Sequence, residues 1–285
     1  MIEGSIWIAA LLGFVSSFLG GMLGIGGGVF IVPVLILFLH LPAHVAVSSS
    51  LICIVATAST ASITYINNNL TNIRLSLLLI ACSIPGAIAG SFIANSISTS
   101  TLVILLSILL VAIAVSMLFR VSPKEETLQQ VIEADYNKRI NRPYWWSFYD
   151  LYLQKDVYYR ITRLPLGMVL SFLGGVISSI FGVGGGVIFV PVMALVMGVP
   201  IKIAIACSSF IIGITAACGS IIHYYHGYIQ PLIIAPLVLG SFVGARLGSL
   251  AAQKVNAGLL KKLFFMILIL IAAVMILRLN NIIPL

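Results

Sequence analysis

The residue pattern best suited to holding a ligand in this chain is a glycine run that interrupts a long apolar segment and occurs twice. The first run and the proline that follows it are Gly24, Gly26, Gly27, Gly28 and Pro33. The second run begins 158 residues later and repeats the spacing, as Gly182, Gly184, Gly185, Gly186 and Pro191. Non-helical backbone at membrane depth is tolerated only where protein buries it or where it lines a cavity. The two breaks therefore predict a transport path.

The segments after the glycine runs indicate what kind of ligand would fit. Residues 29–41 and 187–199 hold 13 residues each, or about 20 Å of helix, which is too short to cross a hydrocarbon core of about 30 Å. A helix that starts near the midplane would present unpaired N–H groups and its positive dipole end to a ligand, and glycines permit close approach. This arrangement favours a small anion. The alternative is that the glycines only allow close helix packing. Pro33 and Pro191 lie inside these segments, where a proline loosens or breaks a helix.

Hydroxyl and guanidinium groups inside the apolar segments are further candidates for contact with an anion. Ser50 and Ser208, with Thr57 and Thr215, could offer hydroxyls to an oxyanion, or could instead bond one helix to another. Arg246 lies in a span otherwise made of apolar and small residues, where a guanidinium is costly unless it faces a cavity or a partner. Its planar fork suits oxyanions. Snorkelling to the lipid headgroups would also explain it.

Four histidines fall near the predicted outer ends of the spans: His40, His44, His223 and His226. With an ordinary pKa near 6.5 they could carry a coupling proton, although a position at the membrane interface explains them as well. No Asp or Glu lies within the predicted spans. This absence disfavours both a carboxylate proton relay and the transport of a cation.

Cysteine usage predicts no metal site and no disulfide. The four cysteines lie inside apolar runs without paired or metal-ligand spacing: Cys53, Cys82, Cys207 and Cys218. Paired catalytic groups at a plausible spacing are lacking as well. The sequence therefore predicts neither an enzyme nor a cofactor.

The composition sets these residues in a membrane. Hydrophobic residues make up 61% and charged residues 8% of the 285 residues, and the mean hydropathy is +1.18, which excludes a soluble globular domain. The residues from Met1 to Glu3 lack the basic region of a cleaved signal peptide, so the first apolar run is expected to be a retained helix. The net charge of +8 is not a nucleic-acid signal, because most basic residues fall in one hydrophilic segment, residues 121–163.

The glycine runs belong to a longer internal repeat. Aligned at the 158-residue offset without a gap, about 75 residues of each half match, including Pro42 with Pro200 and Gly86 with Gly244. Each half is predicted to form a broken hairpin followed by three full spans. The predicted segments are 5–22, 29–41, 44–66, 73–94 and 101–119 in the first half, and 164–180, 187–199, 201–225, 231–252 and 259–277 in the second.

The distribution of basic residues predicts how the two halves are oriented. If each half crosses the membrane an odd number of times, the second half is inverted, and 13 of the 15 basic residues face the cytoplasm. A parallel arrangement would leave ten inside and four outside. Because basic residues near spans prefer the cytoplasmic side, we expect an all-α polytopic membrane protein with two inverted-topology repeats. Each repeat would contain a glycine-broken helical hairpin, re-entrant or fully spanning, plus three transmembrane helices. The first repeat would cover residues 1–120 and the second residues 164–285, with both termini outside.

The segment between the repeats, residues 121–163, is the one sizeable hydrophilic stretch and is expected on the cytoplasmic face. The residues from Ser122 to Glu125 match a capping box with proline at the first helical position, which predicts a short amphipathic helix. Aromatic residues then crowd residues 144–159, between lysines and arginines. This mixture suits the lipid headgroup region, so an interfacial segment is expected. A gating or partner-binding role is the alternative.

The chain resembles the TauE/SafE sulfite exporter family, also called the 4-toluene sulfonate uptake permeases. The two glycine runs with their prolines match the duplicated G-x-G-G-G-x-x-x-x-P segment of that family. Two further family stretches are approximated by residues 48–51 with 207–210, and by residues 85–91 with 243–249. The resemblance covers nearly the whole chain except residues 121–163.

This resemblance implies a secondary transporter in the cytoplasmic membrane that moves a small sulfur oxyanion, sulfite or an organosulfonate, with export as the leading direction. The anion would be held between the two glycine-rich helix starts while the repeats rock to alternate access. Two alternatives stay open: an anion channel with converging half-helices, and an uptake permease for another sulfur-containing anion. The expected partners are the small anion and the lipid bilayer, with no nucleic acid. A homo-oligomer is left open.

Overall fold

The computed structural model describes residues 2–37, 39, 41–98, 145–150 and 154–255, together with a few separate positions within 101–108 and 259–270. Five helices of this part are long and apolar enough to cross a membrane: α3 (Ala43–Asn67), α4 (Ile73–Ser96), α7 (Leu164–Phe181), α9 (Ile201–Tyr225) and α10 (Pro231–Lys254). The expectation of a predominantly helical polytopic membrane protein is therefore confirmed. The expected last span of each half, and the expected amphipathic helix between the halves, lie largely or wholly outside the described residues.

The glycine runs separate helices at the expected places. α1 (Ile2–Leu23) ends directly before the first glycine, and α2 (Gly28–Leu37) begins with the last one. In the second half α7 ends at Phe181, and α8 (Gly186–Pro191) begins at the equivalent glycine. Below, residues 24–28 are called the first tip and residues 182–186 the second tip. Both helices that follow a tip are shorter than the 13-residue segments expected from the sequence.

The two prolines behave differently, although each lies in the helix that follows a tip. α2 continues as a regular helix through Pro33. Pro191 ends α8, and the chain continues as a π-helical turn, η1 (Val192–Val196), in which the N–H of Met197 donates to the carbonyl oxygen of Val192 at 3.1 Å. A proline has no N–H, and its ring crowds the preceding turn. The wider π turn is one way to accommodate such a ring.

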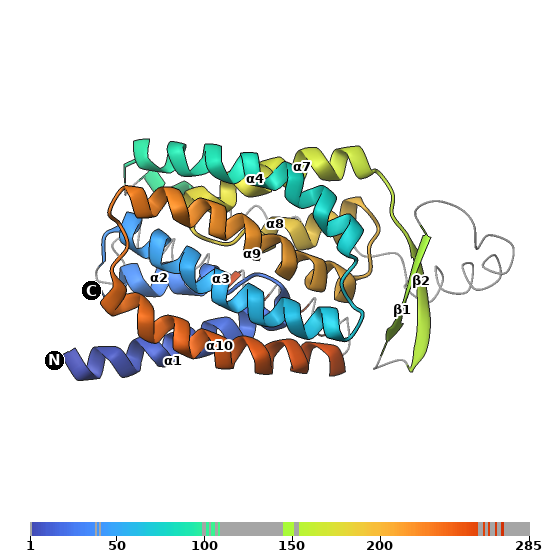
Figure 1. The fold of residues 1–285 in the computed structure, drawn as a ribbon, viewed down its shortest axis with the longest axis horizontal. Helices are drawn as coiled ribbons and strands as arrows, with labels where there is room; N and C mark the ends of the chain where they lie inside the picture. The colour runs from blue at the N-terminus through green and yellow to red at the C-terminus, as the bar shows by residue number, and fades with distance from the viewer. Residues whose placement is uncertain are drawn as a thin grey trace, which may run out of the picture.

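The outer helices of each half pack against outer helices of the other half (Figure 1). α1 runs along α10 and α4 runs along α7, while α3 and α9 lie between them and contact each other. Glycines bring these backbones close together. A Cβ on Gly86 of α4 would overlap the carbonyl oxygen of Phe172 on α7, and a Cβ on Gly244 of α10 would overlap that of Phe14 on α1. The two contacts are equivalent in the repeat, because Gly86 corresponds to Gly244 and Phe14 corresponds to Phe172 at the 158-residue offset.

One element departs from the all-α expectation, because part of the aromatic-rich segment forms a β-hairpin. β1 (Trp145–Asp150) pairs antiparallel with β2 (Lys155–Arg160). Side chains alternate along β1, where Phe148 and Asp150 are buried and Tyr149 between them is exposed, as the period of two of a strand requires. The hairpin lies at one end of the helix bundle, and α1 begins at the other end (Figure 1).

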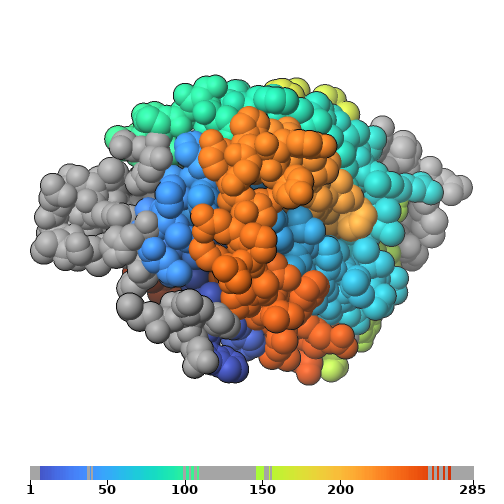
Figure 2. Space-filling model, turned by 60° about the vertical axis from the view of Figure 1, so that its left-hand side comes forward, coloured from blue at the N-terminus to red at the C-terminus, as the bar shows by residue number. Residues whose placement is uncertain are grey.

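The central helices α3 and α9 run in opposite directions. At the hairpin end of the bundle, Asn68 after α3 and Lys202 at the start of α9 line one cavity. At the far end, the ring of His44 at the start of α3 stacks on Tyr228 after α9, with 5.2 Å between the ring centroids. Figure 2 looks toward this far end, where the start of α3 (blue), the end of α4 (green) and the connection from α9 to α10 (orange) come together.

Candidate functional site

The two tips need glycine because their backbone is left-handed at three positions each. The φ angles are +70° at Gly24, +84° at Gly26 and +80° at Gly27. The second tip repeats them, with +64° at Gly182, +83° at Gly184 and +69° at Gly185. Side chains with a Cβ rarely adopt this conformation, whereas glycine adopts it at little cost. The repeated spacing of the glycines is therefore the direct cause of the two helix breaks.

The fourth glycine of each tip serves close contact between the tips. A Cβ on Gly28 would overlap the carbonyl oxygen of Gly182, and a Cβ on Gly186 would overlap the carbonyl oxygen of Gly24. Neither residue has a positive φ, so the requirement there is space and not backbone conformation. The two tips therefore contact each other directly.

Each tip is connected to a neighbouring helix by one buried serine. The hydroxyl of Ser50 on α3 donates to the carbonyl oxygen of Gly182 at 2.7 Å, and the hydroxyl of Ser208 on α9 donates to that of Gly24, also at 2.7 Å. Each serine therefore reaches the tip of the opposite half. In this conformation the hydroxyls bond helix to tip, which is the second of the two roles that the sequence left open.

The helix starts at the tips leave buried backbone donors without an acceptor. In α2 the N–H groups of Phe30 and Ile31 donate to Gly27, and α8 has the equivalent pair to Gly185. The N–H groups just before them have no hydrogen-bond acceptor among the described residues: Gly28, Val29, Gly186 and Val187. All four residues are buried. Buried N–H groups without a partner are rare in proteins and costly, so these four donors are candidates for contact with a ligand.

Comparison with known proteins decides the family. The sequence model described as "Sulfite exporter TauE/SafE" matches residues 9–275. The chain belongs to this family. Its relatives include "Probable membrane transporter protein YunE" of Bacillus subtilis, 26% identical over 95% of this chain and 97% of the relative. A "Probable membrane transporter protein" of Haemophilus influenzae is 29% identical over 96% of this chain and 98% of the relative. No solved structure matches the chain. The protein is thus a membrane transporter and not an enzyme.

Arg246 is not brought to the tips of this TauE/SafE transporter. Its side chain is exposed on α10, on the same outer surface as Phe242 and Leu250. The opposite side of α10 carries Gly244 and Gly248, which contact the backbone of α1. This placement agrees with a guanidinium that snorkels along the lipid-facing surface.

The two threonines that were candidates for oxyanion contact bond to neighbouring helices. The Oγ1 of Thr57 lies 2.6 Å from the Oγ of Ser17 on α1, and the Oγ1 of Thr215 lies 2.8 Å from the Oγ of Ser83 on α4. All four residues are buried. These hydroxyl pairs hold α3 and α9 to the outer helices.

Three of the four histidines gather around Tyr228 at the far end. His44 and His226 both stack on the Tyr228 ring, with centroids 5.2 and 6.1 Å away. His223 is fully buried, and its Nε2 lies 3.4 Å from the carbonyl oxygen of Ser179, near the end of α7. His40 lies outside the described residues. The clustering confirms nothing about a coupling proton, which stays a prediction.

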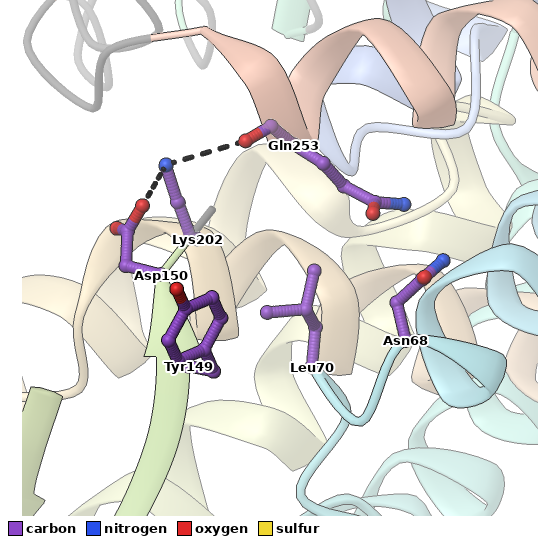
Figure 3. A pocket seen from close by; sticks show the side chains of 6 residues that line it. All are labelled: Asn68, Leu70, Tyr149, Asp150, Lys202 and Gln253. Atoms are coloured by element: carbon purple, nitrogen blue, oxygen red, sulfur yellow. Dashed lines mark hydrogen bonds and ion pairs between the residues drawn. The ribbon is translucent and has the colours of Figure 1, made fainter. Parts of the chain in front are cut away.

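The sequence did not indicate the ion pair at the hairpin end. In the sequence, Lys202 lies at the end of a predicted span, where an ordinary cation is expected. In the structure its ammonium donates to the carboxylate of Asp150 on β1 at 2.7 Å, and the two side chains are only 6% and 7% exposed. A cavity of about 80 Å³ adjoins the pair and is lined by Asn68, Leu70, Tyr149, Asp150, Lys202 and Gln253 (Figure 3).

Further contacts hold the hairpin against the helix ends. The side-chain amide of Asn72 donates to the hydroxyl of Tyr159 at 3.1 Å, and the guanidinium of Arg74 lies 5.7 Å from the centre of a Trp146 ring, a cation–π distance. Burial raises the pKa of the Tyr159 phenol well above its ordinary value, so the phenol stays protonated at all physiological pH values. In this conformation these contacts join the hairpin to the helix ends.

Removing the serine bonds to the tips should weaken the protein measurably. We expect Ser50→Ala and Ser208→Ala each to lower the free energy of unfolding by about 1 kcal/mol, because each leaves a buried carbonyl without its donor. Thermal unfolding of the purified protein in detergent measures this. Ser209→Ala is the matched control, since the Ser209 hydroxyl bonds only to Ile205 in its own helix. Equal losses for Ser208→Ala and Ser209→Ala would show that the bond to the tip contributes nothing.

Proposed function

We propose that this TauE/SafE transporter is a secondary transporter that exports a small sulfur oxyanion, sulfite or an organosulfonate. The anion would bind between the two tips. The observation that carries this proposal is the set of four buried backbone N–H groups at the tips that lack an acceptor. Apart from Glu3 in the first turn of α1, the described helices contain no Asp or Glu. Within these helices a cation would find no further carboxylate, whereas an anion would find N–H donors at the tips.

The two repeats, in this proposal, have inverted topology. The support is that α1 starts at the far end and α7 starts beside the hairpin (Figure 1), and that α3 and α9 also start at opposite ends. The basic residues add a second argument, because 13 of 15 would face the cytoplasm if the hairpin end is cytoplasmic. The transporter would then lie in the cytoplasmic membrane with both termini outside.

Transport requires the tips to separate. With Gly28 against the carbonyl of Gly182 and Gly186 against that of Gly24, the contact leaves no room for an oxyanion between these atoms. The conformation described here would be a closed one. Rocking of the repeats would open the contact toward one end at a time, as alternating access requires. The same contact argues against a permanently open anion filter.

Counterflow in proteoliposomes tests this function. Vesicles loaded with unlabelled sulfite should take up labelled sulfite transiently above its equilibrium level, and the initial rate should saturate with concentration. A carrier gives this result because unlabelled sulfite inside the vesicle competes with the label for the inward-facing site and slows the exit of the label. Flux that stays linear with concentration and shows no counterflow would identify a channel. No sulfite or organosulfonate flux above that of empty vesicles would contradict the proposed substrate class.

A further inference from the structure

The positions that line the cavity at the hairpin end occur a second time in the chain. Four of its six lining residues come from the repeats themselves, and each has an equivalent 158 residues away. The pairs are Lys202 with His44, Gln253 with Asn95, Asn68 with His226, and Leu70 with Tyr228. The remaining two lining residues, Tyr149 and Asp150, belong to β1 and have no counterpart.

The four equivalent residues also meet in space, at the far end. His44 and His226 stack on Tyr228, and the side-chain nitrogen of Asn95 lies 3.2 Å from a ring nitrogen of His226. The fold thus gathers the same four positions of the repeat at each end of the central helices. Each of these two groups contains polar residues. We therefore expect each group to mark one end of a path through the protein.

The two arrangements differ in whether their polar groups are satisfied. At the hairpin end the Lys202 ammonium has the Asp150 carboxylate at 2.7 Å. At the far end, the Nδ1 of His44 and the Oδ1 of Asn95 are buried and have no hydrogen-bond partner among the described residues. The carboxylate that satisfies one arrangement comes from the hairpin, which lies outside the repeat.

The groups around Lys202 fit an oxyanion. Lys202 and Gln253 are buried, at 6% and 5% exposure, and Lys202 is the second residue of α9, where the helix dipole is positive. The side-chain amides of Gln253 and Asn68 each donate one bond to their own helix, to Ser249 and Thr64, which leaves each amide a second N–H. Figure 3 shows both amides across the cavity from the ion pair. A volume of about 80 Å³ is several times the roughly 10–15 Å³ of cavity that holds one water.

We propose that Lys202, Gln253 and Asn68 form a binding site for a small oxyanion at the hairpin end of the path, and that the Asp150 carboxylate fills this site in the structure. Asp150 is itself an oxyanion, and its carboxylate accepts from the Lys202 ammonium of this site. The transported anion would replace it when the hairpin moves away, so the hairpin would act as a competitor for the site. This proposal rests on the proposed function for the identity of the path.

Thermal unfolding of the purified protein, followed by tryptophan fluorescence, tests the site without measuring transport. Asp150→Asn should lower the Tm in sodium chloride, because a buried lysine loses its partner. Sodium sulfite or sulfate at equal ionic strength should then raise the Tm of Asp150→Asn by several degrees more than that of the unsubstituted protein, because the anion replaces the carboxylate. The double variant Asp150→Asn with Lys202→Gln should lose this extra rise.

The matched control is Asp156→Asn, which removes an exposed carboxylate from the same hairpin. The Tm of Asp156→Asn in sodium chloride, and the rise of that Tm with sulfite or sulfate, should equal those of the unsubstituted protein. An equal oxyanion-dependent rise in Asp150→Asn and Asp156→Asn would overturn the proposal, and so would a rise that persists in the double variant. If Asp150→Asn does not fold, Asn68→Ala leaves the ion pair intact and serves instead. It should raise severalfold the oxyanion concentration needed for half-maximal stabilisation, and an unchanged concentration would overturn the site.

The counterflow experiment separates failure of this site from failure of the proposed function. Oxyanion-dependent stabilisation of Asp150→Asn without any sulfite flux in the unsubstituted protein would leave the site standing and remove sulfite as the substrate. Sulfite counterflow without the stabilisation would leave the function standing and remove the site.

Discussion

Alanine at Gly28 or Gly186 is expected to abolish sulfite flux and to lower the free energy of unfolding by about 3 kcal/mol per substitution. Overpacking of a filled interior costs about 1–3 kcal/mol, and the upper value applies because the added methyl would meet backbone atoms of the opposite tip at both sites, and at Gly28 also the side chains of Ile54 and Ser50. A loss is expected at both sites, since each added methyl would overlap a carbonyl oxygen of the opposite tip. Thermal unfolding in detergent and proteoliposome flux measure the two effects.

Two glycines elsewhere supply the controls for this prediction. Gly227 has a φ of +74° with no atom within 4 Å of an added Cβ, so Gly227→Ala reports the cost of backbone conformation alone. Gly213 lies within α9, and an added Cβ there would come 3.2 Å from the Cβ of Ala58. Gly213→Ala should therefore cost far less than Gly28→Ala. Equal costs would mean that the tips are not in contact.

Valine at Gly86 or Gly244 is expected to prevent stable folding. Each glycine lets a helix of one half touch the backbone of a helix of the other half, at Phe172 and Phe14. Because these interfaces join α4 to α7 and α1 to α10, a branched side chain there would force the halves apart, at a cost of about 3 kcal/mol or more. Size-exclusion chromatography should show loss of the monodisperse peak.

Substitutions on the other side of α10 distinguish helix packing from a general sensitivity of this helix. Phe242 and Leu250 are 47% and 42% exposed on the outer surface. Phe242→Ala and Leu250→Ala should therefore change the free energy of unfolding by less than about 1 kcal/mol, as surface changes usually do. Folding that survives Gly244→Val but fails with Leu250→Ala would contradict the described packing.

The helices could be predicted from the sequence because apolar runs and glycines determine them locally. α9 covers the expected residues 201–225, and α10 begins at the expected Pro231. The tips followed from the same local information, since three positive φ angles per tip leave few choices except glycine.

The hairpin and its ion pair could not be predicted in the same way. Asp150 and Lys202 come from different elements, 52 positions apart, and no periodicity relates an insert to a repeat. Aromatic residues on both faces of β1 and β2 hid the alternation that marks a strand. For Arg246 the residue type alone suggested contact with an anion, but its side chain is exposed on the outer surface of α10, away from the tips.

The central claim is that the transported anion passes between the tips, and the accessibility of Ser50 tests it most directly. Ser50→Cys would be made in a variant whose four native cysteines are replaced and which retains sulfite flux. A membrane-impermeant thiol reagent, applied from either side of the vesicles and then washed out, should modify this cysteine and abolish flux. Ser209→Cys is the control. Ser209 is buried on α9 next to Ser208, the equivalent of Ser50, but its hydroxyl bonds within α9, so this cysteine should be left unmodified. Sulfite flux that continues after the cysteine of Ser50→Cys is fully modified would contradict passage between the tips. So would a variant that transports sulfite while its Ser50→Cys thiol reacts from neither side.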